Sequence, residues 1–330
     1  MKVLFIGGTG IISSACSDLA LQRGIELYLL NRGQSSLRPI PQGAQVLKGD
    51  IRDPQSVLTA IGKMHFDSVV DWVTFTPDQA ENDVKLFSGR TDQFIFISSA
   101  SAYQKPVAGL PITESTVLKN PYWEYSNNKI LCEGLLLDAY RKDDFPITIV
   151  RPSHTYDKWS LPMEGGWTVL DRIRHGKQVI VHGDGTSLWV MTHHKDFAKG
   201  FVGLLGNPHA IGEAVHITSD EAITWNQIFE YFAKPLGVTP KIVHIPSDRI
   251  NQYDKNWGAS LLGDKAFSVI FDNSKIKRLV PDFCATIPFA QGAAEIVDWY
   301  LGDESRQKVD PAFNQLCDRI IEDYQKTEPK

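Results

Sequence analysis

The chain has 330 residues, with 34 basic and 39 acidic side chains and a formal net charge of −5 at pH 7. Its length predicts one large or two ordinary domains, and its 42% hydrophobic and 22% charged residues exclude a disordered or fibrous protein. There is no general positive charge to hold nucleic acid or an anionic membrane, and no apolar run approaches the roughly 20 residues of a membrane helix.

The N-terminus and the cysteines indicate the compartment. A strand-like run begins at Val3 without the apolar helix or cleavage site of a signal peptide, so we expect a cytoplasmic protein with no membrane partner. The four cysteines are dispersed and form no Cys-x-x-Cys pair, which predicts buried free thiols. Adjacent histidines such as His193 and His194 would point to opposite faces of a strand, so no metal site is expected.

The first half of the chain alternates short apolar runs with amphipathic segments. The runs are KVLFIGG, IELYLLN, AQVLKGD, DSVVDWV, QFIFISS and ITIVRPS. Runs rich in Val, Ile and Leu without clean polar alternation are typical of parallel strands buried on both faces. The intervening segments are long enough for helical crossovers, and Gly24 is placed to end the first helix. We therefore predict an α/β protein with a Rossmann-like, doubly wound parallel sheet.

After Pro152 the alternation weakens, and Gly, Pro and Trp become frequent, as in a smaller and loop-rich lobe. Apolar residues at helical spacing predict helices over 225–234 and 289–300. The charged tail at 302–330 is expected to fray in its last residues. We predict an NAD(P)-binding domain over residues 1–154, to which a segment near 186–215 returns, and a mainly substrate-binding lobe over 155–330.

The segment Gly7-Gly8-Thr9-Gly10-Ile11-Ile12-Ser13 follows the first strand directly and opens the first helix. Glycines there allow a tight turn and let the backbone approach a pyrophosphate, and the helix N-terminus supplies partial positive charge and free N–H groups. This context favours dinucleotide binding over a plain glycine turn. The third glycine of the usual fingerprint is replaced by Ser13, which is small enough to keep the packing.

The ends of the second and third strands bear on the choice of cofactor. The second strand ends in Asn31 and Arg32, where a carboxylate would normally accept the adenosine ribose hydroxyls. Arg32 could instead pair with a 2′-phosphate, so NADP is expected, with NAD as the alternative. A solvated turn is the other interpretation of Arg32. Asp50, at the end of the third strand, could reach the adenine amino group, or it could cap a turn as Asp53 could.

Two segments suggest catalysis. Ser98 and Ser99 end the fifth strand, and Tyr125 and Lys129 open a predicted helix. Residues four apart share a helix face, so the lysine could lower the phenol pKa from about 10 while bonding a cofactor ribose. Ser99 could stabilise the same substrate oxygen during hydride transfer. A Tyr-x-x-x-Lys pair arises easily by chance, but its order after the glycine loop and the serines favours catalysis over surface helix residues.

These features resemble the extended short-chain dehydrogenase/reductase family, in its NAD-dependent epimerase/dehydratase branch. The resemblance rests on GGTGIIS, GDIRD, FISSASAY, YSNNK with Glu133, VRPSHTYD, HGDGTS and FDNSKIKRLVPDF. It implies Ser99, Tyr125 and Lys129 as catalytic residues and possible pairing into a homodimer. It also implies a set of cofactor-binding residues, namely Gly7, Thr9, Gly10, Ile11, Ile12, Asn31, Arg32, Asp50, Ile51, Ser98, Tyr125, Lys129 and Pro152.

One departure narrows the substrate. Nucleotide-sugar members of this branch carry an arginine for the substrate diphosphate at the position of Trp189. We therefore expect an NAD(P)-dependent epimerase, dehydratase or reductase that acts on a hydroxyl or ketone carbon of a sugar-like small molecule. The alternative is a non-enzymatic, nucleotide-sensing or RNA-associated protein on the same fold, because the C-terminal half also resembles the chloroplast stem-loop-binding group. The net charge and the Ser-Tyr-Lys set argue against a nucleic-acid partner.

Overall fold

A seven-stranded parallel sheet forms the centre of the computed structural model, which describes residues 1–33 and 38–327. Its strand order is β11-β6-β5-β4-β1-β2-β3, so the chain winds outward from β1 to β3 and then restarts on the other side of β1. The strands are β1 (Lys2–Ile6), β2 (Glu26–Asn31), β3 (Gln45–Lys48), β4 (Ser68–Asp71), β5 (Phe94–Ile97), β6 (Ile147–Pro152) and β11 (Ala214–Ile217). The predicted doubly wound α/β fold is confirmed.

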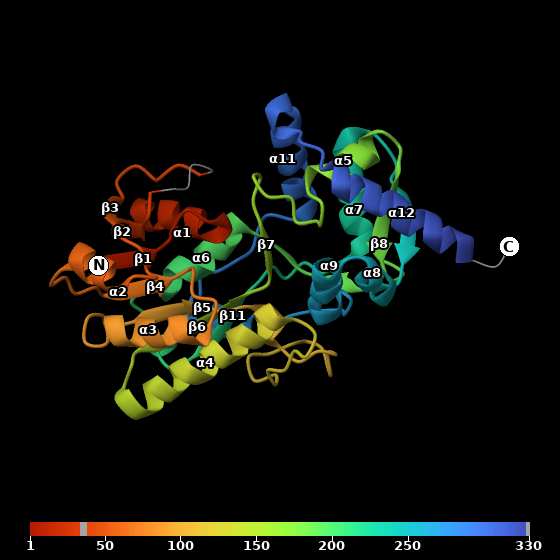
Figure 1. Ribbon diagram of the computed structural model, residues 1–330. Coiled ribbons are helices and arrows are strands. Elements are labelled where there is room, and N and C mark those ends of the chain that lie inside the picture. Colours follow the sequence, from red (N-terminus) through yellow and green to blue (C-terminus); the bar gives the residue numbers. More distant parts are fainter. Residues whose placement is uncertain (34–37, 328–330) are drawn as a thin grey trace.

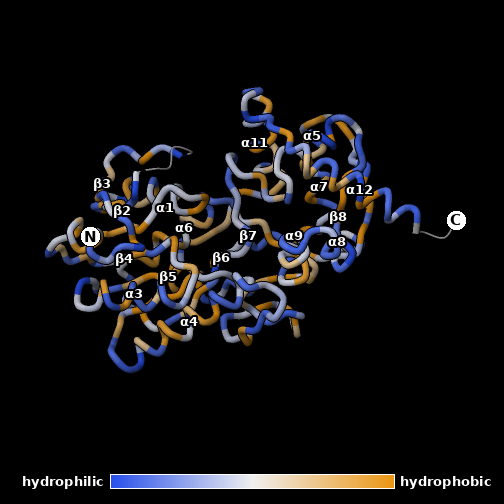
Figure 2. The backbone as a smooth tube through the Cα atoms, in the orientation of Figure 1, coloured by the Kyte–Doolittle hydropathy of each residue, from blue (hydrophilic) through white to orange (hydrophobic). Residues whose placement is uncertain are grey.

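Helices cover both faces of this sheet (Figure 1). One face packs against α1 (Ile11–Gln22) and α6 (His194–Leu204), and the other against α2 (Pro54–Ile61), α3 (Pro77–Phe87) and α4 (Glu124–Asp143). Strands β4 and β5 are buried at every residue, which explains why their sequences lack alternation. Hydrophobic residues follow these central strands in Figure 2. Gly24 adopts φ +75° just after α1, as its predicted role requires.

A second lobe lies to the right in Figure 1, away from the N-terminus. A parallel strand pair, β8 and β13, and several helices build it around a core of its own. Its elements are α5 (Trp167–Arg174), β8 (Gln178–His182), α7 (Trp225–Ala233), β13 (Lys241–Ile245), α8 (Ser247–Tyr253), α9 (Lys255–Ser260), α11 (Phe289–Leu301) and α12 (Pro311–Thr327). The helices predicted over 225–234 and 289–300 are confirmed as α7 and α11.

Short pairs and crossing segments connect the two parts. Strands β7 (His154–Tyr156) and β10 (Met191–His193) pair in parallel, and β9 (Leu188–Trp189) pairs antiparallel with β12 (Ile223–Thr224). From there the chain returns to the sheet, because α6 packs on α1, β11 pairs with β6, and α10 (Ser274–Leu279) packs beside both. The division of the chain at residue 154 stays a prediction.

The charged tail contains helix α12, and Phe313, Cys317, Ile320 and Ile321 bring it into the core of the second lobe. The fraying expected of the last residues falls on 328–330, which lie outside the described part, and stays a prediction. One expectation is wrong: Cys284 is exposed, whereas the other three cysteines are buried free thiols as predicted. Within residues 1–33 and 38–327, no helix has the length and hydropathy needed to cross a bilayer.

Candidate active site

The glycine loop leaves β1 at its carboxyl end and enters α1. Gly7 and Gly8 both adopt φ +100°, a conformation that strains any residue with a side chain. A Cβ on Gly8 would lie 2.6 Å from the Leu29 side chain. The Ser13 hydroxyl accepts the Gly10 N–H at 2.7 Å, so serine suits this position as a helix cap. The first-turn N–H groups of α1 have no acceptor within the helix, which leaves an anion-binding edge.

A pocket of about 320 Å³ lies beside this loop, and its wall includes Gly7, Thr9, Asn31, Arg32, Asp50 and Ile51. The Asn31 side chain accepts the Gly33 N–H at 2.9 Å. The Asp50 carboxylate accepts the Arg52 N–H at 3.0 Å and faces the Arg32 guanidinium at 3.9 Å. Asp53 caps helix α2. The turn-capping alternative is therefore observed for both aspartates, and Arg32 is exposed beside one of them.

The three predicted catalytic residues converge at the carboxyl edge of the sheet. Ser99 follows β5, and Tyr125 and Lys129 lie on the first turns of α4. The Ser99 oxygen accepts the Ser101 N–H at 3.1 Å and lies 2.8 Å from the Ser101 hydroxyl, which itself accepts from Ser126. Either hydroxyl can donate in the contact between Ser99 and Ser101. Burial raises the pKa of Tyr125, and a hydrogen bond with the Ser99 side chain opposes the rise.

The Lys129 side chain is buried and is fixed by contacts that the sequence did not predict. Its buried ammonium donates to the carbonyl oxygens of Thr74 at 2.6 Å and Ile97 at 2.7 Å. It lies 4.6 Å from the centre of the Phe75 ring and 5.8 Å from that of Tyr125. Burial lowers the pKa of Lys129 to about 8. The expected lowering of the Tyr125 pKa by this lysine is not observed, because desolvation dominates at the phenol and the ammonium faces two backbone carbonyls.

A buried ion pair supports the end of β5. Glu133 on α4 forms two hydrogen bonds with the Arg151 guanidinium on β6, and it also accepts the Ser98 hydroxyl. Arg151 donates further to the Tyr103 hydroxyl at 3.2 Å. Ser98 is 2% exposed and its hydroxyl is directed into the protein. Its contribution to the site is therefore to fix the strand from which Ser99 follows, whereas a direct cofactor contact stays a prediction.

The second lobe contributes a wall that the sequence did not reveal. A cleft of about 340 Å³ is lined by Ser99, Tyr125 and Pro152 on one side and by Trp123, His154, Trp189, Asp264 and Lys265 among the others. Asp264 and Lys265 lie on a single π-helical turn, Leu261–Lys265. Asn120 ties this turn to the catalytic side, since its amide donates to the Ser101 and Gly263 carbonyls. No motif marks these residues, because only the fold brings residue 264 to residue 125.

The histidines of the cleft are neutral. The Trp189 indole N–H donates to the His154 ring nitrogen Nδ1 at 3.0 Å. Burial lowers the pKa of His154 to about 3 and that of His182 to about 4. Within residues 1–33 and 38–327, no group of three His, Cys, Asp or Glu side chains is arranged to hold a metal ion.

Comparison with known proteins identifies the family of this chain. A model of the NAD-dependent epimerase/dehydratase family matches residues 3–218, which include the glycine loop, Ser99, Tyr125 and Lys129. The chain belongs to this family. It is accordingly an enzyme of an NAD-dependent family, as the resemblance implied. The match ends before the π-helical turn, so the family assignment does not cover the cleft wall that Asp264 and Lys265 form.

Individual relatives are distant. The 2'-dehydrokanamycin reductase of Streptomyces kanamyceticus is 23% identical over 86% of this chain and 80% of its own. The chloroplast stem-loop binding protein of 41 kDa b of Arabidopsis thaliana is 26% identical over 74% of this chain and 65% of its own. The solved dTDP-glucose 4,6-dehydratase of Bacillus anthracis, in complex with NAD, superposes with a TM-score of 0.74 at 20% identity, covering 92% of this chain and 98% of that one. This structural likeness supports the fold alone.

Proposed function

We propose that the protein catalyses NAD(P)-dependent hydride transfer at a hydroxyl or ketone carbon of a sugar-like substrate, as an epimerase, dehydratase or reductase. The observation that carries the proposal is the convergence of Ser99 and Tyr125 in one cleft, with Lys129 buried beneath them and the glycine loop beside them. Separate segments of the chain supply each part, and only this fold assembles them.

The nicotinamide cofactor fits the residues present. A Cβ on Gly8 would collide with Leu29, so glycine lets the loop pack closely on the strands, and the φ of +100° at Gly7 and Gly8 suits glycine alone. Gly7 and Thr9 line the pocket beside the loop. Gly7, Thr9, Gly10, Ile11 and Ile12 would hold the pyrophosphate, and Asn31, Arg32, Asp50 and Ile51 the adenosine end. Lys129 and Pro152 would hold the nicotinamide half. When bound, the cofactor accepts or donates the hydride.

The chain supplies the proton chemistry. Tyr125 takes the proton from the substrate hydroxyl, or returns it to the ketone oxygen, at its phenolic Oη. The Ser99 hydroxyl donates to the same oxygen and stabilises the negative charge that develops there. Lys129 holds a positive charge behind the phenol and has one N–H left beyond the two that Thr74 and Ile97 accept. Family membership supports these roles, and direct kinetic tests decide them.

The cofactor is proposed to be NADP in preference to NAD. Arg32 is 59% exposed in its side chain and faces Asp50 only at 3.9 Å. A 2′-phosphate would offer a closer and bidentate partner. NAD carries an uncharged hydroxyl at this position, so the guanidinium would discriminate between the two cofactors.

The decisive variants are Tyr125→Phe and Ser99→Ala, assayed with a panel of sugars and ketones for a change in nicotinamide absorbance and for epimerised product. We expect Tyr125→Phe to lose at least about 100-fold in turnover while its cofactor affinity stays within a few-fold of wild type. The exposed Tyr122→Phe, three residues earlier, is the matched control and should keep full activity. Full turnover by Tyr125→Phe would overturn the proposed acid/base role.

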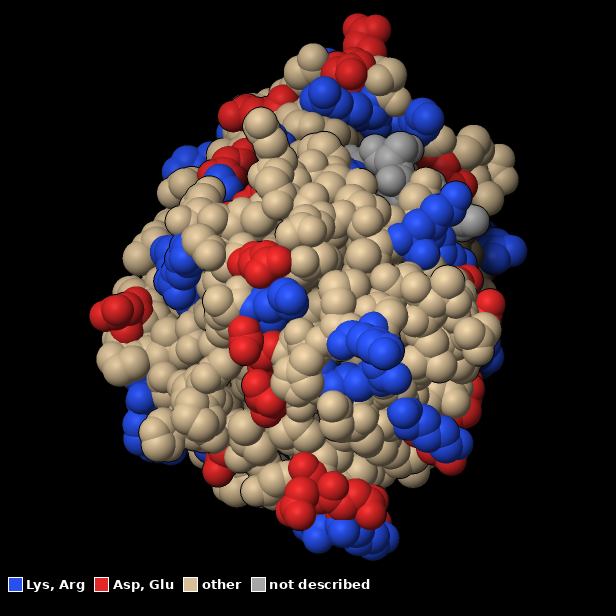
Figure 3. All heavy atoms as spheres, turned by 90° about the vertical axis from the view of Figure 1, so that its left-hand side faces the viewer, with Lys and Arg blue, Asp and Glu red and all other residues tan. Residues whose placement is uncertain are grey.

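The RNA-associated alternative is not proposed for this chain. Its site contains the groups that hydride chemistry uses, and the one face in Figure 3 mixes basic and acidic side chains among uncharged ones. A homodimer, a cytoplasmic location and the division into lobes at residue 154 are part of the proposal. Light scattering of the purified protein tests the first of these directly.

A further inference from the structure

The charges of the substrate cleft are few and mostly paired. Among the residues that line the cleft, Asp264 and Lys265 alone are charged at neutral pH, because burial keeps His154 neutral. The Asp264 carboxylate faces the Lys105 ammonium at 3.2 Å, and that ammonium is completely buried. The charge of Asp264 is therefore balanced by that of Lys105. The charge that is left in the cleft without a counterion is positive.

That charge belongs to Lys265. Its ammonium makes no hydrogen bond or ion pair with any residue of the described chain, and lies 5.5 Å from the centre of the Trp123 ring. Burial lowers the pKa of Lys265, with Asp264 and Glu164 opposing the shift from a distance. A largely buried ammonium that has an aromatic ring beside it but no counterion is costly, and a negatively charged ligand would relieve this cost. Lys265 thus marks the place where the cleft can accept an anion.

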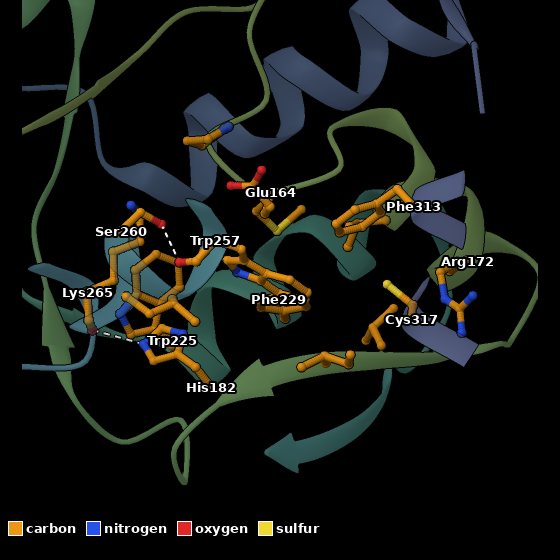
Figure 4. Close-up of a pocket in the computed structure, with 16 residues that line it drawn as sticks. Glu164, Arg172, His182, Trp225, Phe229, Trp257, Ser260, Lys265, Phe313 and Cys317 are labelled. Atoms are coloured by element: carbon orange, nitrogen blue, oxygen red, sulfur yellow. Dashed lines mark hydrogen bonds between the residues drawn. The ribbon is translucent and has the colours of Figure 1, made fainter. Parts of the chain in front are cut away.

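The other cations near Lys265 in the described part of the chain are already paired, as Lys105 is with Asp264. Lys265 also lines an inner chamber of the second lobe, which Figure 4 shows with Trp225, Phe229, Trp257 and Phe313 around it. Arg172, at the opposite side of this chamber, is fully engaged: it donates to Asp318 at 2.6 Å, to the Asn314 side chain at 2.6 Å and to the Gln178 carbonyl at 2.9 Å. His182 is neutral, and its ring bonds the Lys265 carbonyl.

The chamber is also small. Its volume is about 50 Å³, against roughly 300 Å³ at the lower end for ligand pockets. Phe313 of α12 packs on Trp257 and against Gly165 in its wall. In the substrate cleft, Trp189 is 1% exposed and its indole N–H is already donated to His154. The chamber is therefore too small for a nucleotide base.

We propose that the cleft takes a sugar-like substrate with a single anionic group, a carboxylate or a phosphate monoester, and that Lys265 binds this group while Tyr125 faces the reacting carbon. A nucleoside diphosphate, with a charge on each of two phosphates, would leave one of them without a cation. The inference rests on the proposed function and narrows its substrate to sugars that carry no nucleotide.

The test compares four probes by calorimetry on the cofactor-loaded protein: glucuronate, glucose 1-phosphate, neutral methyl glucoside and UDP-glucose. We expect the first two to bind about tenfold or more tightly than methyl glucoside, and UDP-glucose to bind no better than glucose 1-phosphate. Lys265→Met should remove the advantage of the anionic probes, Lys265→Arg should keep most of it, and Lys241→Met, on the exposed strand β13, should change nothing.

Each outcome either supports or overturns the proposed anion site. A preference for glucuronate alone or for glucose 1-phosphate alone tells a carboxylate site from a phosphate site, and both support the proposal. UDP-glucose binding tenfold more tightly than glucose 1-phosphate, an anion preference that survives in Lys265→Met, or no binding of either anionic probe would overturn it. Cofactor binding by the same protein, and loss of turnover in Tyr125→Phe, would leave the proposed function standing in every one of those cases.

Discussion

The buried pair of Glu133 and Arg151 should anchor the catalytic edge of the sheet. Arg151→Met would leave the Glu133 carboxylate, 1% exposed, with only the Ser98 hydroxyl as a donor. Removing one partner of such a pair costs about 3–5 kcal/mol. At about 2–4 °C per kcal/mol for a domain of this size, the melting temperature should fall by roughly 6–20 °C.

Thermal unfolding of four variants tests this reasoning: Arg151→Met, Glu133→Leu, the double variant and a control. Glu133→Leu combined with Arg151→Met removes both charges, so the double variant should be more stable than the sum of the single losses indicates, by at least about 1 kcal/mol. Lys142→Met, which breaks an exposed ion pair with Asp138 on the same helix, is the control and should change little. If Arg151→Met melts within about 2 °C of wild type, the pair does not anchor the edge and the reasoning is wrong.

Three further predictions concern the ligands. Arg32→Ala should weaken NADP by about 10- to 100-fold and NAD hardly at all, and Asp50→Asn, which frees Arg32, should strengthen NADP; equal losses for both cofactors would remove the argument for NADP. Gly8→Ala should abolish cofactor binding or destabilise the fold, because its φ is +100° and its Cβ would lie 2.6 Å from Leu29. Gly89→Ala, at a φ of +69° and with open space around it, should bind cofactor normally. Normal stability and binding in Gly8→Ala would refute the tight packing of the loop. Glucuronate affinity should fall as pH rises, because the anion needs protonated Lys265. The fall should begin below the ordinary lysine pKa of 10.5, since burial lowers the pKa of Lys265 while Asp264 and Glu164 oppose the shift. His154 and His182 stay neutral over this range, so an affinity independent of pH up to 10.5 would contradict the assignment.

The sequence was most informative for features that lie within a single strand, helix or loop. Each central strand is one continuous apolar run that fits a buried parallel sheet, so the doubly wound fold class could be predicted from few rules. The order of the strands in the sheet was not predicted. The glycine loop and the Tyr125 to Lys129 spacing place chemistry within single elements or their junctions. These parts of the site could be predicted without a structure.

The wall that the second lobe adds to the cleft could not be predicted from the sequence. Asp264 and Lys265 lie on a π-helical turn, which has no repeating pattern. Their place in the same cleft as Tyr125 depends on how two distant segments pack. Helix α12 is different, because a signal was present. Phe313, Leu316, Cys317, Ile320 and Ile321 recur at helical spacing, but the charges between them masked the apolar face.

Binding of the nicotinamide cofactor tests the central claim most directly. The purified protein would first be examined by absorbance and mass for cofactor that copurifies, and then titrated with NADP and NAD by calorimetry. We predict one site per chain, with NADP bound more tightly than NAD. If neither cofactor copurifies or binds, the glycine loop does not serve hydride transfer in this chain, and the proposed enzyme activity is wrong.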